Sequence, residues 1–292
     1  MHKSGFVNII GCPNVGKSTL LNALVGERLS IITSKAQTTR HRIMGIVSDE
    51  NYQIVFSDTP GILKPAYKLQ EKMMQFVVSA FSDADLFLLI TDIFEDIQLD
   101  ENYLLKLQKS STPILLLINK IDQVKDKELE DKFDKWKNLL PNAEIIPISA
   151  LLKFNLDNLL KRIVELLPPG DAFYDKNELT DKPERFFVSE IIREKILLNY
   201  KKEIPYSVEV LVESFKEEEK IIKINAVILV EREGQKGIII GHQGEAIKRV
   251  GTKARLECEQ FFNKKVHLEL YVKVEKDWRS SDRHLKNFGY SE

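Results

Sequence analysis

Residues 11–18 read GCPNVGKS and lie between an apolar run at residues 6–10 and a helical pattern at residues 19–25. This is the G-x-x-x-x-G-K-S pattern of a phosphate-binding loop, in the strand–loop–helix setting that such a loop needs. Small, turn-permitting residues let successive backbone N–H groups face phosphate oxygens, and the start of the next helix adds positive potential. The segment therefore predicts a nucleoside triphosphate site that contains Asn14, Val15, Gly16, Lys17, Ser18 and Thr19.

A strand–helix alternation surrounds this loop as far as Pro168. Strands are expected at residues 6–10, 42–48, 53–57, 86–91, 114–119 and 144–148, and helices at residues 18–25, 68–80, 100–108, 127–138 and 155–167. Continuous apolar runs such as residues 86–90 and 114–118 are typical of strands buried on both faces of a mainly parallel sheet. The pattern predicts a doubly wound α/β domain.

The length and composition of the chain predict two domains in a reducing compartment. With 292 residues, 43% of them hydrophobic and 30% charged, the chain is long enough for two ordinary globular domains. We place the first at residues 1–170, a polar linker at 171–181 and the second at 182–292. Cys12 and Cys258 lack metal-ligand spacing, so neither a disulfide nor zinc is expected and a cytoplasmic location is the simplest interpretation. The first expected strand begins too early to leave room for a signal peptide, and no apolar run approaches the ~20 residues of a membrane-spanning helix.

Two later segments predict that the base is guanine. The tetrapeptide at residues 119–122 reads NKID at the end of an apolar strand, and its carboxylate, Asp122, can accept from both N1–H and the 2-amino group of guanine. Adenine offers neither donor, and charge-assisted bonds of this kind are worth about 1.5–3 kcal/mol each. Residues 148–150 read ISA, where a small residue lets a backbone N–H reach the guanine carbonyl oxygen. The residues expected to recognise the base are Asn119, Lys120, Asp122, Ser149 and Ala150.

Residues 58–61 read DTPG and carry the expected catalytic apparatus together with the loop lysine. Lys17 contacts the β- and γ-phosphates, Ser18 is a Mg²⁺ ligand, and Asp58 lies near the ion through a bound water. The Gly61 N–H is free to approach the γ-phosphate, which couples nucleotide state to the following loop. Many GTPases place a water-orienting glutamine next, but here the residue is Ile62, so we predict slow intrinsic hydrolysis unless another group, ion or partner completes the site.

The polar segment at residues 35–42, KAQTTRHR, is expected to respond to the nucleotide. A hydroxyl here can complete Mg²⁺ coordination in the GTP state and release it afterwards. We favour Thr39 over Thr38 for this role, with an ordinary connecting loop as the alternative.

The second domain contains a Gly-x-x-Gly loop within residues 237–244, followed by a long helix at residues 245–262. The expected element order is helix–strand–strand–helix–helix–strand, with a Gly-rich turn before the long helix and a solvated hairpin tip at residues 217–219. The helix is locally basic, which suits a polyanion, although a solvated helix face would show the same charges. Loop and helix together resemble the type II KH arrangement, which clamps a nucleic-acid backbone, with a packing glycine turn as the alternative. The residues expected at RNA are Ile240, Gly241, His242, Gln243, Gly244, Lys248 and Arg249.

Taken together, these motifs resemble the Era family of bacterial ribosome-assembly GTPases over nearly the whole chain. The carriers are GCPNVGKST at 11–19, KAQTTRHR at 35–42, DTPG at 58–61, NKID at 119–122, ISA at 148–150 and GIIIGHQGEAIKRVG at 237–251. The resemblance implies GTP hydrolysis that switches binding to 16S ribosomal RNA near its 3′ end and assists maturation of the 30S subunit precursor. It also implies that an apolar residue at Ile62 is normal, whereas Cys12 stands where the family commonly has arginine.

The resemblance leaves several expectations to be tested. Asn14 matches an asparagine that helps to hold K⁺ in related cation-dependent GTPases, and a simple turn-forming role explains it equally well. Family members also occur peripherally at the inner membrane, although no amphipathic anchor is evident here. We expect a monomer that binds no DNA. Two other functions compete with the GTP-controlled RNA switch: a constitutive RNA-binding assembly factor in which GTP only stabilises the fold, and a membrane-associated signalling GTPase.

Overall fold

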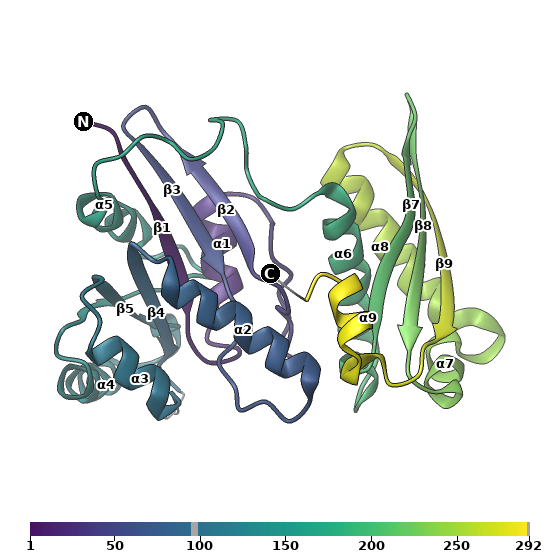
Figure 1. Ribbon diagram of the computed structural model, residues 1–292, viewed down its shortest axis with the longest axis horizontal. Coiled ribbons are helices and arrows are strands. Elements are labelled where there is room, and N and C mark those ends of the chain that lie inside the picture. The colour runs from purple at the N-terminus through teal and green to yellow at the C-terminus, as the bar shows by residue number, and fades with distance from the viewer. Residues whose placement is uncertain (95–98, 291–292) are drawn as a thin grey trace. The chain divides into compact units, whose positions relative to one another are not determined.

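The computed structural model describes residues 1–94 and 99–290 (Figure 1). These residues group into two units. The first comprises Met1–Ala66 and Gln70–Asp181, and the second comprises Tyr67–Leu69 and the described residues from Lys182 onward. No helix in the described residues is long and apolar enough to cross a bilayer.

The first unit is built on a single six-stranded sheet in the order β2-β3-β1-β4-β5-β6. All neighbouring strands are parallel except β2 and β3, which form an antiparallel hairpin. The expected doubly wound α/β fold is therefore confirmed. Its strands are β1 (Lys3–Ile10), β2 (Ile43–Ser48), β3 (Tyr52–Asp58), β4 (Leu86–Asp92), β5 (Ile114–Asn119) and β6 (Glu144–Pro147). Its helices are α1 (Lys17–Val25), α2 (Lys68–Ser82), α3 (Glu101–Gln108), α4 (Asp126–Leu139) and α5 (Leu156–Leu166).

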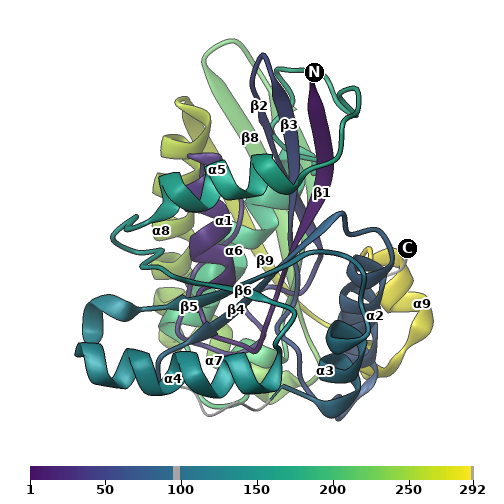
Figure 2. The same ribbon diagram turned by 90° about the vertical axis from the view of Figure 1, so that its left-hand side faces the viewer.

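Helices cover both faces of this sheet, which is why its central strands are apolar throughout. Leu107 of α3 and Trp136 of α4 pack against Phe87 and Leu116 of the sheet. Figure 2 shows α1 and α5 on the opposite side from α2 and α3. Strands β1, β3, β4 and β5 run parallel to one another, so their carboxyl ends lie at the same end of the sheet. Sheets of this type bind ligands at that end.

The segment expected to be a linker, residues 171–181, is fastened to the first unit. The Ile46 N–H donates to the Leu179 carbonyl (2.9 Å), so part of the segment pairs alongside the edge strand β2. The fully buried Gln53 accepts from the N–H groups of Phe173 and Tyr174 through its side-chain oxygen. Composition could not reveal this attachment, because it depends on the backbone bond at Ile46 and on the side-chain amide of Gln53, which forms hydrogen bonds with the backbone of the segment.

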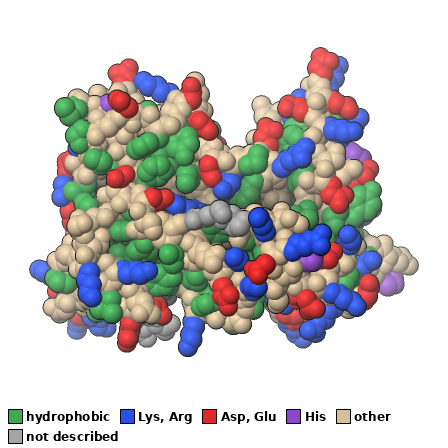
Figure 3. All heavy atoms as spheres, viewed as in Figure 1, with side chains coloured by type: hydrophobic (Ala, Val, Ile, Leu, Met, Phe, Trp, Pro, Cys, Tyr) green, Lys and Arg blue, Asp and Glu red, His purple; other side chains and the backbone are tan. Residues whose placement is uncertain are grey.

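The second unit has a three-stranded sheet in the order β7-β8-β9, with β7 antiparallel and β9 parallel to β8. One face of the sheet packs against α6 and α8, and buried aliphatic side chains at alternate positions of β8 form its core. The elements are α6 (Glu184–Asn199), β7 (Glu209–Glu217), β8 (Ile221–Val230), α7 (Glu233–Ile240), α8 (Glu245–Phe262), β9 (Lys265–Val274) and α9 (Asp282–Asn287). The expected element order is confirmed, and the β7–β8 hairpin ends in a tip where acidic and basic side chains gather (Figure 3).

The Gly-rich turn expected before the long helix is shorter than the sequence suggested. Residues 233–240 form α7, because the Gln235 side chain accepts from the N–H groups of Glu231 and Arg232 and Ile239 is fully buried. Only residues 241–244 remain as the turn into α8. The C-terminal helix α9 was not expected; Ser281 caps it by accepting from the His284 N–H.

Candidate nucleotide site and nucleic-acid interface

The phosphate-binding loop runs from the end of β1 into α1 and is held against β5. Asn119 donates through Nδ2 to the Val15 carbonyl (2.8 Å) and accepts the Ala150 N–H through Oδ1 (2.9 Å). Gly16 has φ +105°, and a Cβ there would lie 2.3 Å from Asn119 Nδ2. One amide therefore ties the phosphate loop to the ISA segment, and only glycine fits at position 16.

Lys17 is buried beneath the loop, and its ammonium group donates to the carbonyls of Cys12 (2.6 Å) and Gly11 (3.2 Å). These contacts hold a cation at the floor of the phosphate loop. The Cys12 side chain is itself buried, so the departure from arginine at this position leaves the loop intact.

Ser18, Thr39 and Asp58 come together as a cluster of hydroxyl and carboxylate oxygens. Ser18 Oγ lies 2.9 Å from Thr39 Oγ1 and donates to Asp58 Oδ2 (2.7 Å), and Thr39 Oγ1 donates to the same oxygen (3.3 Å). Thr38 instead donates to the Lys35 carbonyl (2.6 Å). The geometry thus brings Thr39, the favoured threonine, to the expected ion ligands.

The Asp58 carboxylate is completely buried, and its Oδ1 has no hydrogen-bond partner among the described residues. Burial raises the pKa of Asp58, opposed by the positive charge of Lys17 and the hydrogen bond from Ser18. A buried acceptor left unpaired is costly unless a ligand satisfies it. These oxygens fit a hard divalent cation, because Mg²⁺ prefers oxygen ligands and retains several waters.

Gly61 closes the phosphate side of the pocket. A Cβ at this position would lie 2.7 Å from the Pro13 backbone, and the next N–H, that of Ile62, donates to the Gly11 carbonyl (3.0 Å). The Ile62 side chain is buried and cannot orient an attacking water.

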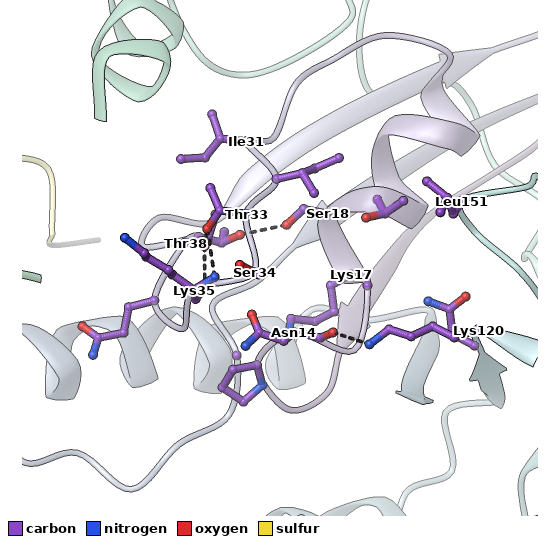
Figure 4. A pocket seen from close by; sticks show the side chains of 18 of the residues that line it. Asn14, Lys17, Ser18, Ile31, Thr33, Ser34, Lys35, Thr38, Lys120 and Leu151 are labelled. Atoms are coloured by element: carbon purple, nitrogen blue, oxygen red, sulfur yellow. Dashed lines mark hydrogen bonds between the residues drawn. The ribbon is translucent and has the colours of Figure 1, made fainter. Parts of the chain in front are cut away.

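A pocket of about 370 Å³ joins the phosphate loop, the segment after α1 and the base-recognition loops. Figure 4 shows Lys120 reaching across to Asn14, where its Nζ donates to the backbone carbonyl (2.9 Å). Asn14 itself has a left-handed backbone (φ 65°), so the turn-forming interpretation of this asparagine has direct support. The expected residues Asn14, Gly16, Lys17, Ser18, Thr19, Thr39, Gly61, Asn119, Lys120, Asp122 and Ser149 all line this pocket.

The structure shows another contact than expected for Ala150 and an additional contact for Val15. The Ala150 N–H, expected to reach a guanine oxygen, donates to Asn119 in this structure because the two loops are packed together. Val15 contributes its carbonyl to Asn119, and its side chain is buried.

Several pocket residues were not anticipated. Residues 31–34 and Leu151 line the cavity, as do Lys35 and Gln37 of the segment that was expected to respond to the nucleotide. Asp92 does not line the cavity but contacts Lys120 from the end of β4. Asp92 could have been found, since it ends an apolar strand in the same way as Asp58 and Asn119. Residues 31–34 and Leu151 carry no motif.

The Gly-x-x-Gly loop of the second unit is open to solvent. Gly241 and Gly244 have φ values of +72° and +78°, and a Cβ on Gly241 would lie 2.6 Å from that of Ala246. His242 and Gln243 between them are exposed, and Gln243 is also left-handed (φ 48°). The loop therefore presents backbone groups without bulky cover, as close approach of a phosphate chain requires.

A groove of about 260 Å³ lies between α8 and β9, and its lining on α8 begins at Ile247, three residues after this loop. It has an aliphatic floor, Leu268 and Leu270, and cationic side chains at Lys248 and Arg255. Of these, Lys248 was assigned to RNA from the sequence, and the basic character of the helix that carries Arg255 was expected; Arg249 is exposed on α8 but does not line the groove. Ile247 and Gly251 belong to the quoted KH-like segment, and the groove residues that were missed are Thr252, Leu268 and Leu270.

Comparison with known proteins agrees with this description in both units. Residues 6–120 match the family described as 50S ribosome-binding GTPase, and residues 203–279 match the KH domain. The GTPase Era of Syntrophus aciditrophicus (strain SB) is 46% identical over 295 residues, covering 100% of this chain and 96% of the relative. That of Staphylococcus epidermidis is 43% identical over 293 residues, covering 100% and 98%.

Two solved structures have the same fold over the whole chain. One is Era in complex with MgGDPNP and nucleotides 1506–1542 of 16S ribosomal RNA, with 37% identity, full coverage of both chains and a TM-score of 0.95. The other is a point variant of Aquifex aeolicus Era bound to GDP and AlF₄⁻, with 38% identity, coverage of 99% and 100%, and a TM-score of 0.95. With a P-loop GTPase fold followed by a KH domain and full-length relatives above 40% identity, this chain belongs to the Era family of GTPases.

Proposed function

We propose that this chain binds and hydrolyses GTP and that its nucleotide state controls affinity for the 3′ end of 16S ribosomal RNA, which assists assembly of the 30S subunit precursor. The observation that carries the proposal is the bond between Thr39, from the segment expected to switch, and Ser18 of the phosphate loop, in a chain that also has an open KH groove. A relative of the same fold has been solved with both ligand types. We assign residues 1–170 to the GTP domain, 171–181 to the connection and 182–292 to the RNA domain.

In the GTP domain, Asp122 and Lys120 hold guanine while the phosphate-loop N–H groups and Lys17 hold the phosphates. Ser18 and Thr39 would ligate Mg²⁺ directly, and Asp58 would accept from one of its waters. An ion held by these residues would supply positive charge beside the β- and γ-phosphates. The Gly61 N–H contacts the γ-phosphate, so loss of that group alters the loop after it.

Hydrolysis lacks a water-orienting side chain at position 62, so the intrinsic rate is slow. We assign to Asn14 the binding of K⁺ beside the phosphates, which would supply the missing positive charge. The left-handed turn at Asn14 is compatible with this role, because its side chain lines the pocket. Turnover should therefore be faster in KCl than in NaCl.

In the KH domain, the Gly241–Gly244 loop holds the RNA backbone and the groove over Leu268 and Leu270 receives unpaired bases. Exposed Lys248 and Arg249 neutralise phosphates, which makes affinity depend on salt. We also assign the chain to the cytoplasm, with peripheral association at the inner membrane surface. Fractionation of cells would test both assignments.

The direct test is GTP turnover of the full chain, together with its affinity for a 3′-end 16S RNA and for a scrambled RNA of equal length. We expect slow hydrolysis that needs Mg²⁺, and at least tenfold preference for the authentic RNA. Equal affinity for the two RNAs would overturn the ribosomal assignment and favour a GTPase with another partner. Turnover of ATP at the same rate would overturn the assignment of the base.

A further inference from the structure

The ion pair between Lys120 and Asp92 is a charged contact beside the nucleotide pocket to which no role has yet been assigned. Lys120 Nζ lies 2.5 Å from Asp92 Oδ2, and the Asp92 side chain is only 10% exposed. Asp92 does not line the pocket, so it cannot act on the nucleotide directly.

Asp92 is itself held in a fixed orientation. It ends β4, directly opposite Asn119 in the parallel pairing with β5. Its second oxygen, Oδ1, accepts the Phe94 N–H (3.0 Å) across a tight turn. One carboxylate oxygen is therefore occupied by the backbone, and the other is aimed at the ammonium group.

Lys120 needs such support because its backbone is in the left-handed region (φ 64°, ψ 29°). Its ammonium also donates to the carbonyl of Asn14, so the charged end is held by β4 on one side and by the phosphate loop on the other. The methylene stem between these anchors lines the pocket at its base-binding end. Partial burial makes the pair stronger than an exposed ion pair, because solvent screening is reduced.

We propose that Asp92 is a positioning residue of the nucleotide site: it fixes Lys120 over the base position. This inference rests on the proposed guanine-nucleotide site and adds a residue to it. Because the pair lies at the base end, it supports GDP and GTP equally and acts on nucleotide release rather than on the chemical step.

The test is a double-mutant cycle with Asp92→Asn and Lys120→Met, measured with GDP and with a non-hydrolysable GTP analogue in the presence of Mg²⁺. Asparagine keeps an acceptor for the Phe94 N–H, and methionine keeps the apolar stem. We expect Asp92→Asn to weaken both nucleotides by the same factor of about ten to a hundred, the worth of a charge-assisted hydrogen bond, mainly through faster dissociation. KM for GTP should rise while kcat changes little.

In the Lys120→Met background, Asp92→Asn should add almost nothing, because the partner is already gone. The matched control is Asp85→Asn at the opposite end of β4, where the carboxylate accepts the Phe6 N–H (2.8 Å); its nucleotide dissociation rate should equal that of the wild type. An equal loss of affinity in both backgrounds would assign Asp92 a purely structural role and overturn the inference.

The wild-type measurement separates the two claims. A wild-type chain that binds neither nucleotide overturns the proposed function and this assignment with it. A wild-type chain that binds both, with an Asp92→Asn variant of unchanged affinity, overturns only the role of Asp92.

Discussion

At the nucleotide site the decisive groups are buried and already paired, whereas at the KH loop they are exposed. Lys17 and Asn119 are 5% and 3% exposed, and each bonds to backbone carbonyls of the phosphate loop. His242 and Gln243 stand in solvent, and the neighbouring groove has an aliphatic floor. Buried groups act in a low dielectric, where one atom decides affinity and specificity. Exposed cations and backbone act collectively and are screened by salt.

The largest effect should come from Asp122→Asn. The carboxylate accepts two guanine donors, and two charge-assisted bonds of about 1.5–3 kcal/mol each correspond to at least a hundredfold in affinity. We expect GDP to bind about a hundredfold more weakly or worse, and xanthosine diphosphate, which offers an acceptor where guanine has its amino group, to bind better than to the wild type. Calorimetry or competition with a fluorescent nucleotide measures both.

Asp126→Asn, four residues further on and exposed at the start of α4, is the matched control. It removes the same charge and should leave both affinities unchanged. Unaltered GDP affinity in the Asp122→Asn variant would remove Asp122 from the base site.

Thr39→Val should have the next largest effect, on hydrolysis rather than on GDP binding. Valine keeps the shape but removes the hydroxyl bonded to Ser18 and Asp58. Loss of one preorganised polar group at a reacting phosphate costs about a hundredfold in kcat. Single-turnover hydrolysis measures this. Thr38→Val, which removes hydrogen bonds to the Lys35 carbonyl and to the Thr33 hydroxyl, should hydrolyse at the wild-type rate. A reversed pattern would exchange the roles of the two threonines.

Introducing two negative charges into the KH loop tests the exposed site. The double variant His242→Asp and Gln243→Asp changes exposed side chains only, so folding is retained, while the phosphate chain is repelled. We expect RNA affinity to fall by about tenfold or more at low salt, with less difference at high salt because exposed charges are screened. GTP hydrolysis should be unchanged. Gln260→Asp, exposed at the far end of α8, should bind RNA as the wild type does.

The smallest expected effect concerns the stability of the nucleotide-free chain. Burial raises the pKa of Asp58, so ionising this carboxyl costs stability at neutral pH. That cost shrinks as the pH falls below the folded pKa and is gone below the lower pKa of the unfolded chain. Asp58→Asn should therefore raise the thermal midpoint at neutral pH, with a difference that shrinks on acidification. Asp83→Asn should lower the midpoint instead, since it breaks an ion pair with the buried Arg42. A lower midpoint for Asp58→Asn at neutral pH would contradict the burial argument.

The same contrast explains what the sequence could predict. Motifs such as NKID and DTPG mark strand ends, and periodicity located the strands, so most of the nucleotide pocket was predicted from residue order. Thr39 of the KAQTTRHR segment also lies beside Ser18 and Asp58, as expected from the sequence. The roles of Asp92 and Gln53 and the extent of α7 were missed, because each depends on a tertiary partner. The partners are the Lys120 ammonium group, the backbone at residues 173–174 and the capping amide of Gln235. The groove floor at Leu268 and Leu270 was missed because aliphatic residues on a strand look like core.

The central claim is that nucleotide state, set at the buried site, controls the exposed one. The most direct measurement is the dissociation constant of the full chain for the 3′ segment of 16S ribosomal RNA, with GDP and with a non-hydrolysable GTP analogue, at one fixed salt concentration. A coupling of about 1–3 kcal/mol predicts roughly five- to 150-fold tighter binding in the analogue state. Equal affinity in the two states would contradict the account and leave a constitutive RNA-binding protein in which GTP only stabilises the fold.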